Sequence, residues 1–210
     1  MRQFLPKPVA DRIIASGDDT QLLARHRREI AVLFADLRGF TAFAETNDAE
    51  VVTDALNAFH NNVGPLIESD EGTLERILGD GLVALSNVLS KCADPESRAL
   101  NLALDIQNGF RPAMKKVQGP VHRLGFGMGI AKGIASLGQI GFEGRLDYAA
   151  IGTVSNVASR LCDLALDAEV LVSKNVVYEH RDEFSFVEQE PRPLKGIEQP
   201  MQYFKLNGTL

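Results

Sequence analysis

Two aspartates occupy positions where a carboxylate could hold a cation next to a phosphate group. Asp36 follows the apolar run Ile30–Ala35 and precedes the turn Leu37–Thr41, whereas Asp80 is the central residue of Gly79–Gly81 between two short apolar runs. If these runs form neighbouring strands, both carboxylates lie at adjacent strand ends and can chelate the same ions. Backbone N–H groups in the turn after Asp36 could then bind phosphate oxygens.

A purely structural interpretation of both aspartates stays open. Asp36 could cap the helix that follows, and Asp-Gly is a common choice for a type I′ hairpin turn without any function. The four histidines, His26, His60, His122 and His180, have no metal-ligand spacing, and we interpret them as structural or exposed.

A second group of polar residues lies further along the chain. Asn156 and Arg160 are four residues apart on a predicted helix, so their side chains leave the same helix face. An amide can orient a sugar oxygen, and a guanidinium can neutralise charge that develops on phosphorus. Lys195, which precedes a glycine, could hold a terminal phosphate. A solvated helix face and ordinary surface charge are the simpler alternatives.

Apolar periodicity predicts the elements that position these residues. Asn47 and Glu50 form a capping pair before a helix that extends to Leu66, and the short amphipathic segment Pro6–Ser16 is typical of a connector. Further helices are predicted over 99–110 and 154–166. Strands are predicted over 30–35, 74–78, 82–85, 121–134, 170–173, 184–187 and 201–206, with a hairpin arm within 133–144. Irregular alternation with hairpins predicts an α+β fold whose mixed sheet carries helices largely on one face.

Composition narrows the class of protein. The chain has 210 residues, is 45% hydrophobic and carries a net charge of -6, which fits one globular domain and argues against a nucleic-acid partner. No segment approaches the roughly 20 apolar residues of a membrane span, so we expect a cytoplasmic protein without a membrane segment. Cys92 and Cys162 lack metal-ligand spacing and are expected to be free thiols.

Taken in order, these motifs resemble the class III adenylyl and guanylyl cyclase family. The resemblance covers residues 29 to 210. It rests on Glu29–Thr41, on Leu78-Gly79-Asp80-Gly81, on Asp147–Gly152 with Asn156–Leu161, and on Leu194-Lys195-Gly196. The segment from Phe4 to Ala10 is similar to the transducing linker that precedes many bacterial members. We therefore divide the chain into a linker, residues 1–28, and a catalytic domain, residues 29–210.

The resemblance implies a ferredoxin-like core and a reaction. A homodimer with shared active sites would convert ATP to 3′,5′-cyclic AMP and pyrophosphate with two Mg²⁺ or Mn²⁺ ions, downstream of a regulatory domain. Asp36, Leu37 and Asp80 would bind metal, whereas Asn156 and Arg160 would be catalytic and would come from the other chain. The substrate would be bound by Leu37, Gly39, Phe40, Thr41, Arg76, Ala149 and Lys195.

The sequence departs from the family pattern where the base and the phosphates are bound. Arg76 stands where adenylyl cyclases have Lys and guanylyl cyclases have Glu, and Ala149 replaces an Asp or Thr. Arg76 can donate to adenine N1 but cannot accept from the exocyclic amine. Glu75 could accept, yet strand alternation predicts that it points away from Arg76. Ile134 replaces an arginine that anchors phosphate.

We favour ATP because a donor suits adenine N1, and GTP remains an alternative. A weakly active homologue that serves as a nucleotide-binding dimerisation module is a second alternative. Another palm-like nucleotidyl transferase, such as a diguanylate cyclase, is a third alternative, although no GGDEF-like turn is present.

Overall fold

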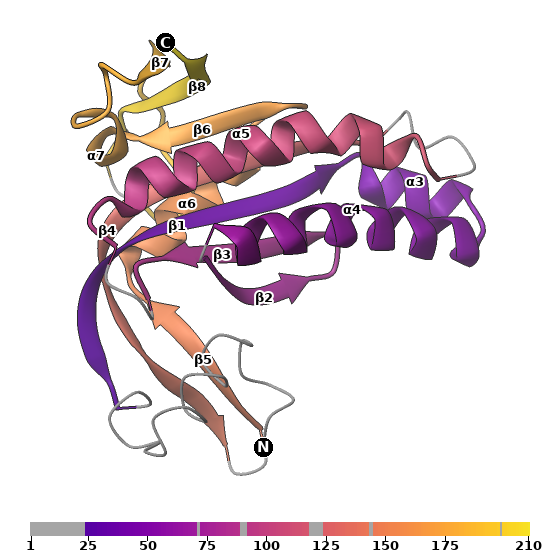
Figure 1. The fold of residues 1–210 in the computed structure, drawn as a ribbon, viewed down its shortest axis with the longest axis horizontal. Helices are drawn as coiled ribbons and strands as arrows, with labels where there is room; N and C mark the ends of the chain where they lie inside the picture. Colours follow the sequence, from indigo (N-terminus) through magenta and orange to yellow (C-terminus); the bar gives the residue numbers. More distant parts are fainter. Residues whose placement is uncertain (1–23, 71, 89–91, 118–123, 143–144, 198) are drawn as a thin grey trace.

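The computed structural model describes residues 24–70, 72–88, 92–117, 124–142, 145–197 and 199–210. Within these residues the chain forms an eight-stranded sheet with helices on both faces (Figure 1). The predicted helix Pro6–Ser16 lies outside the described residues.

The sheet is mixed and mostly antiparallel, as the sequence predicts. Its strand order is β2-β3-β1-β4-β6-β8-β7, and β5 pairs with β4. Among the strand pairs of the described residues, β4 and β6 run parallel and the others antiparallel. The strands are β1 (His26–Arg38), β2 (Thr73–Leu78), β3 (Gly81–Ser86), β4 (Gly125–Phe142), β5 (Arg145–Ile151), β6 (Glu169–Ser173), β7 (Phe184–Glu188) and β8 (Tyr203–Thr209).

Within the described residues, the helices lie largely on one face of the sheet, as the sequence predicts, and a single helix covers the other face. The helices are α3 (Phe40–Thr46), α4 (Ala49–Ser69), α5 (Pro95–Met114), α6 (Thr153–Leu164) and α7 (Lys174–Val177). Leu33 of β1 belongs to the core cluster under α4 and α5, whereas Val32 belongs to the cluster under α6. Over Ile30–Ala35 both sets of alternating β1 side chains are apolar, so both faces of the sheet must be covered there.

Several boundaries differ from the prediction because neighbouring elements extend or shorten them. β1 begins at His26 and pairs with β4 as far as Arg38, well beyond the apolar run. The residue that caps α4 is Asp48, whereas Asn47 ends α3, where its Nδ2 donates to the Phe43 carbonyl at 2.8 Å. The single strand β4 contains residues 125–134 of the predicted strand and one arm of the predicted hairpin, whereas residues 121–123 of that strand prediction lie outside the described residues.

The β2–β3 hairpin is present, but its turn is not type I′. That type needs positive φ at both central residues. Gly79 has φ 71°, whereas Asp80 is not among the non-glycine residues of the described chain that adopt positive φ. The turn therefore depends on Gly79 rather than on an Asp-Gly pair.

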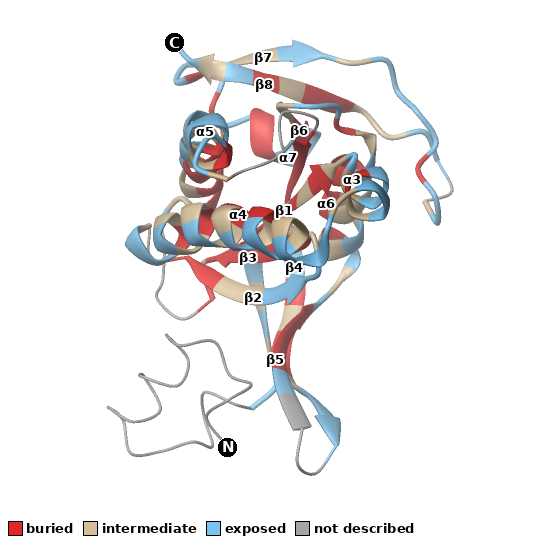
Figure 2. Cartoon of the chain, turned by 90° about the vertical axis from the view of Figure 1, so that its right-hand side faces the viewer, coloured by how far each residue is buried: buried red, intermediate tan, exposed pale blue. Residues whose placement is uncertain are grey.

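The far ends of β4 and β5 project from the body of the protein as an arm in both Figures 1 and 2. Large apolar side chains on this arm are exposed. Phe142 is 70% exposed and Ile140 is about half exposed. None of the helices in the described part of the chain is long and apolar enough to cross a membrane.

Candidate active site

The structure brings Asp36 and Asp80 together at one edge of the sheet. Asp36 pairs with Gly81 in the β1–β3 register, and the Leu37 N–H donates to the Asp80 carbonyl at 3.1 Å. A Cβ atom at position 81 would lie 2.8 Å from Asp36 Oδ1 and 3.1 Å from the Ala35 carbonyl oxygen, so a side chain there would displace the Asp36 carboxylate. Gly81 thus has a steric role beyond the turn itself.

The electrostatics of this pair suit a cation. Burial raises the pKa of the Asp36 carboxyl, and repulsion from Asp80 raises it further. The Arg38 guanidinium opposes both effects because its Nη1 donates to Asp36 Oδ2 at 2.8 Å. Mg²⁺ and Mn²⁺ prefer carboxylate oxygens as ligands. A divalent ion would also relieve the remaining repulsion between Asp36 and Asp80. The residues present therefore fit divalent metal.

Arg38 also ties this site to helix α6. Its Nε donates to the Ala165 carbonyl at 2.8 Å, and its Nη2 donates to the Cys162 carbonyl. These carbonyls lie at the C-terminal end of α6, and the Cys162 carbonyl also accepts from the Ala165 N–H at 3.0 Å. Sequence patterns carried no signal for this link, since the partners are more than 120 residues apart.

The backbone of Gly39 shapes the predicted phosphate turn, and His60 contacts the hairpin turn. Gly39 adopts φ 76°, which lets the chain turn directly from β1 into α3, and Thr41 is exposed in the first turn of that helix. His60 of α4 approaches the Gly79 carbonyl with Nε2 at 3.1 Å. This contact agrees with a structural role for His60 and identifies the turn next to Asp80 as its partner.

Helix α6 carries the second group of predicted residues. Asn156 is exposed, and Arg160 Nε donates to the Lys195 carbonyl at 3.1 Å, so Arg160 and the Lys195 loop lie together. Arg160 Nη1 also pairs with Asp163 Oδ2 at 2.8 Å. Because the Arg160 and Asp163 side chains are partly exposed, at 34% and 59%, their ion pair contributes little free energy and Arg160 can turn towards another anion.

Asp36 and Asp80 are not joined to this second group within one chain. Among the described residues, no hydrogen bond or ion pair links either aspartate to Asn156, Arg160 or Lys195.

A cavity of about 330 Å³ connects the β2–β3 hairpin with α6. Its lining includes Arg76, Glu75, Ala150 and Asn156. Ala149, predicted to bind substrate, is buried and lines a separate cavity of about 270 Å³. The expectation that Glu75 points away from Arg76 is wrong, because a β-bulge between Leu74 and Arg76 interrupts the alternation of β2.

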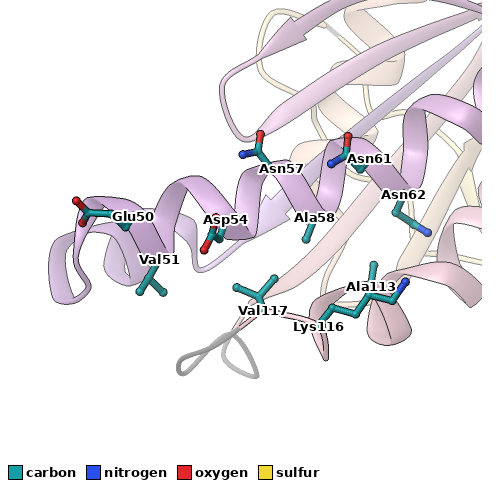
Figure 3. A pocket seen from close by; sticks show the side chains of 10 residues that line it. All are labelled: Glu50, Val51, Asp54, Asn57, Ala58, Asn61, Asn62, Ala113, Lys116 and Val117. Atoms are coloured by element: carbon teal, nitrogen blue, oxygen red, sulfur yellow. The ribbon is translucent and has the colours of Figure 1, made fainter.

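The largest of the described cavities lies elsewhere. It has a volume of about 840 Å³ and lies between α4 and the end of α5 (Figure 3). Glu50, Asp54 and Lys116 are among its lining residues, and none of the predicted site residues lines it. We assign it no role in catalysis.

A separate polar cluster lies at the start of α5. Asp94, Glu96 and His180 place ligand-type atoms within 4.8 Å of one another, and Glu96 and His180 are buried. His180 Nε2 lies 3.2 Å from Asp94 Oδ1, but their geometry is not that of a hydrogen bond. The ammonium of Lys132 contacts Glu96 and already balances part of the negative charge. We therefore do not assign catalytic ions to this cluster.

The paired carboxylates and the sheet define the class of protein. A family model described as the adenylate and guanylate cyclase catalytic domain matches residues 22–208. The chain belongs to this family of nucleotide cyclase domains.

Relatives and solved structures of this family include both kinds of cyclase. An adenylate cyclase of Anabaena cylindrica is 28% identical over 83% of this chain and 36% of its own length. Adenylate cyclase 1 of Rhizobium meliloti is 27% identical over 99% of this chain and 31% of its own length. The chain thus spans about a third of the curated relatives it matches.

Two crystal structures match with TM-score 0.82 and 26% identity over 88% of this chain. They are the adenylyl cyclase CyaB from P. aeruginosa, covered over 96% of its chain, and a guanylyl cyclase, covered over 94%. The fold alone therefore does not distinguish ATP from GTP.

Proposed function

We propose that this domain converts ATP to 3′,5′-cyclic AMP and pyrophosphate, using two divalent ions at a site shared by two copies of the chain. The observation that carries the proposal is the close approach of the Asp36 and Asp80 segments at the edge of the sheet. When bound there, Mg²⁺ or Mn²⁺ would lower the pKa of the ribose 3′-hydroxyl and neutralise charge on the triphosphate. Asp36, Leu37 and Asp80 are the proposed ligands.

The remaining polar residues have proposed roles that follow from their chemistry. Asn156 orients the ribose, and Arg160 stabilises the charge that develops as the α-phosphorus is attacked. Lys195 binds the terminal phosphate. Gly39, Phe40 and Thr41 supply backbone N–H groups at the start of α3. Loss of one such charge contact is expected to lower the rate by about 10²- to 10³-fold.

A shared site is supported by two features of the chain. The aspartates and the α6 residues share no hydrogen bond or ion pair within the described part of one chain, so a partner could complete each half. The arm formed by β4 and β5 exposes Ile140 and Phe142, and exposed apolar side chains of this kind favour association.

The proposal of ATP rests on Arg76, whose guanidinium can donate to adenine N1. Ala149 as a base-binding residue stays a prediction. GTP is the second candidate, because Glu75 lines the same cavity and a carboxylate can accept from the amine and imino groups of guanine.

We propose that the linker predicted over residues 1–28, whose last residues His26–Arg28 also belong to β1, connects the catalytic domain to an upstream regulatory domain of a longer protein, and that this protein produces a cytoplasmic signal.

The direct experiment uses the purified chain with ATP or GTP, each with Mg²⁺ and with Mn²⁺. We expect cyclic AMP from ATP, identified by liquid chromatography and mass spectrometry, with a higher kcat/KM than for GTP. Removal of divalent metal with a chelator should stop the reaction, and re-addition should restore it. Absence of cyclic nucleotide from both substrates under all four conditions would contradict the proposal.

A further inference from the structure

The β-bulge in β2 gives Glu75 an unexpected position. Leu74 pairs with Ala84 and Arg76 pairs with Val83, so Glu75 is the extra residue between two consecutive pairs. A bulge reorients the side chain of the extra residue relative to regular alternation. Here Glu75 Oε1 accepts from Arg76 Nη2 at 2.8 Å, so the two charged groups lie together instead of on opposite faces.

The Glu75 carboxylate is held from two sides. Its side chain is only 5% exposed, and Oε1 also accepts from the Ala150 N–H of β5 at 3.2 Å. A nearly buried carboxylate needs such donors, because desolvation of the charge is otherwise costly. Both donors reach the same oxygen, and no hydrogen bond from the described residues reaches Oε2.

The surroundings of this carboxylate are those of a small-molecule cavity. Glu75, Arg76, Phe34, Ala150 and Asn156 line the same cavity of about 330 Å³. The carboxylate and the guanidinium compensate each other's charge, so the pair suits a neutral polar ligand better than an anion. Side by side, the two groups offer one acceptor and several donors.

We propose that Glu75 is a base-reading residue, and that its carboxylate accepts a hydrogen bond from an exocyclic amine of the purine. In ATP this is the N6 amine, and Arg76 donates to the adjacent N1. The inference rests on the proposed function and deepens it, because it supplies the acceptor that Arg76 and Ala149 both lack. Glu75 also fixes the Arg76 guanidinium and the edge of β5 at the cavity.

A structural role of Glu75 makes a different prediction. If Glu75 only holds Arg76 and Ala150, its loss lowers turnover of every purine nucleotide by a similar factor. If it binds the amine, its loss harms the nucleotides that carry the amine more than those that do not. The two roles therefore separate when the substrate and the residue are changed together.

The experiment compares ATP with purine riboside triphosphate, which lacks the 6-amino group, and GTP with inosine triphosphate, which lacks the 2-amino group. The kcat/KM is measured for wild type, Glu75→Ala and Glu75→Gln. The glutamine variant retains the size of the side chain and an oxygen for the Ala150 N–H, so it guards against loss of folding, which thermal unfolding checks. The matched control is Glu188→Gln on the exposed part of β7.

We expect wild type and the control to prefer ATP over purine riboside triphosphate by about 10- to 100-fold, the range for a hydrogen bond to a charged group. In Glu75→Ala the preference should fall to within about threefold. A contrast restricted to GTP and inosine triphosphate would support Glu75 as the acceptor but contradict ATP as the substrate. An unchanged preference in Glu75→Ala for both nucleotide pairs would overturn the inference.

A binding measurement keeps the test independent of turnover. 3′-Deoxy-ATP lacks the attacking hydroxyl, and its Kd is measured by calorimetry with Mg²⁺, together with that of its 6-unsubstituted analogue. Glu75→Ala should weaken the binding of 3′-deoxy-ATP by about tenfold or more beyond any weakening of the 6-unsubstituted analogue, which reports the loss of Arg76 positioning alone. Equal effects on both ligands would overturn the inference even if the wild-type protein proved to have no cyclase activity.

Discussion

At the scale of single residues, the proposed chemistry depends on a carboxylate held where ionisation is unfavourable. Burial and Asp80 raise the pKa of Asp36, and Arg38 only partly compensates. Without a bound cation, the ionised Asp36 carboxylate destabilises the folded protein. A cation bound between Asp36 and Asp80 would neutralise this negative charge and remove the penalty.

The variant Asp36→Asn tests this balance. We expect cyclase activity to fall at least about 100-fold, because the amide has no negative charge for the metal. The melting temperature of the metal-free protein should change by only a few degrees, because the lost pair with Arg38 is offset by relief of burial and repulsion. Wild-type activity of this variant with Mg²⁺ would contradict the role of Asp36 as a ligand.

The two cysteines should differ in reactivity. Burial raises the pKa of the Cys162 thiol from its ordinary 9.0 to about 11, and both cysteines are free. At pH 8 the thiolate fraction of Cys162 is then about 100-fold below that of an ordinary thiol. We expect iodoacetamide to modify Cys92, which is partly exposed, much faster than Cys162 in the folded protein, as measured by mass spectrometry. Equal rates for both cysteines would be inconsistent with this burial.

The raised pKa of Cys162 also makes the free energy of unfolding depend on pH. Between pH 9 and about 11 the unfolded chain loses the Cys162 proton while the folded chain retains it. The folded state therefore binds more protons in this window, and the contribution of Cys162 to the free energy of unfolding decreases as pH rises. Cys162→Ser should reduce this alkaline decrease.

At the scale of elements, Arg38 joins the end of β1 to the end of α6. Its guanidinium donates to Asp36, Cys162 and Ala165. Within one protomer it thus connects a proposed metal ligand to the helix that carries Asn156 and Arg160. In the proposed dimer, Asp36 and the α6 residues of one chain belong to different active sites. The Arg38 link would therefore join one active site to the other.

Removal of this link should affect both stability and activity. Arg38→Met removes the Arg38 donor from the partly buried Ala165 carbonyl and leaves the Cys162 carbonyl with the Ala165 N–H alone. We expect the free energy of unfolding in urea to fall by about 1 to 3 kcal/mol. Activity should also fall, because loss of the Arg38 guanidinium raises the pKa of the Asp36 carboxyl and disfavours its charged form. Arg27→Met, an exposed position on the same strand, is the control and should change neither quantity. Equal stability of the two variants would show that Arg38 does not hold α6.

At the scale of the whole molecule, the two groups of site residues predict complementation between chains. Asp80→Ala and Arg160→Ala homodimers should each be nearly inactive, because every site lacks either a metal ligand or transition-state charge. A mixed dimer has one site with both lesions and one with neither. After equal mixing with random reassociation, about half of the dimers should contain one intact site.

The measurement is cyclic AMP formation after mixing two differently tagged variants, with subunit exchange verified by tandem purification. We expect activity to reappear although neither parent is active. An inactive mixture in which exchange has occurred would contradict a shared site and favour a site within one chain.

Local pattern by itself determined much of the molecule. Apolar runs located the core of β1, β2 and β3, helical spacing located α4, α5 and α6, and Gly79-Asp80-Gly81 located the hairpin. These features follow from periodicity and turn chemistry, which act over a few residues. The family motifs are of the same kind, and they sufficed for the fold and the cyclase family.

Only the tertiary structure decided how distant groups meet. The bulge at Glu75 arises from pairing of β2 with β3, so strand alternation alone predicts the wrong direction for its side chain. The contacts of Arg38 with α6 and of His60 with Gly79 join segments that no local pattern relates. Whether a charged side chain faces a cavity, a helix end or solvent depends on which strands pair and which faces are covered, and these are properties of the assembled sheet.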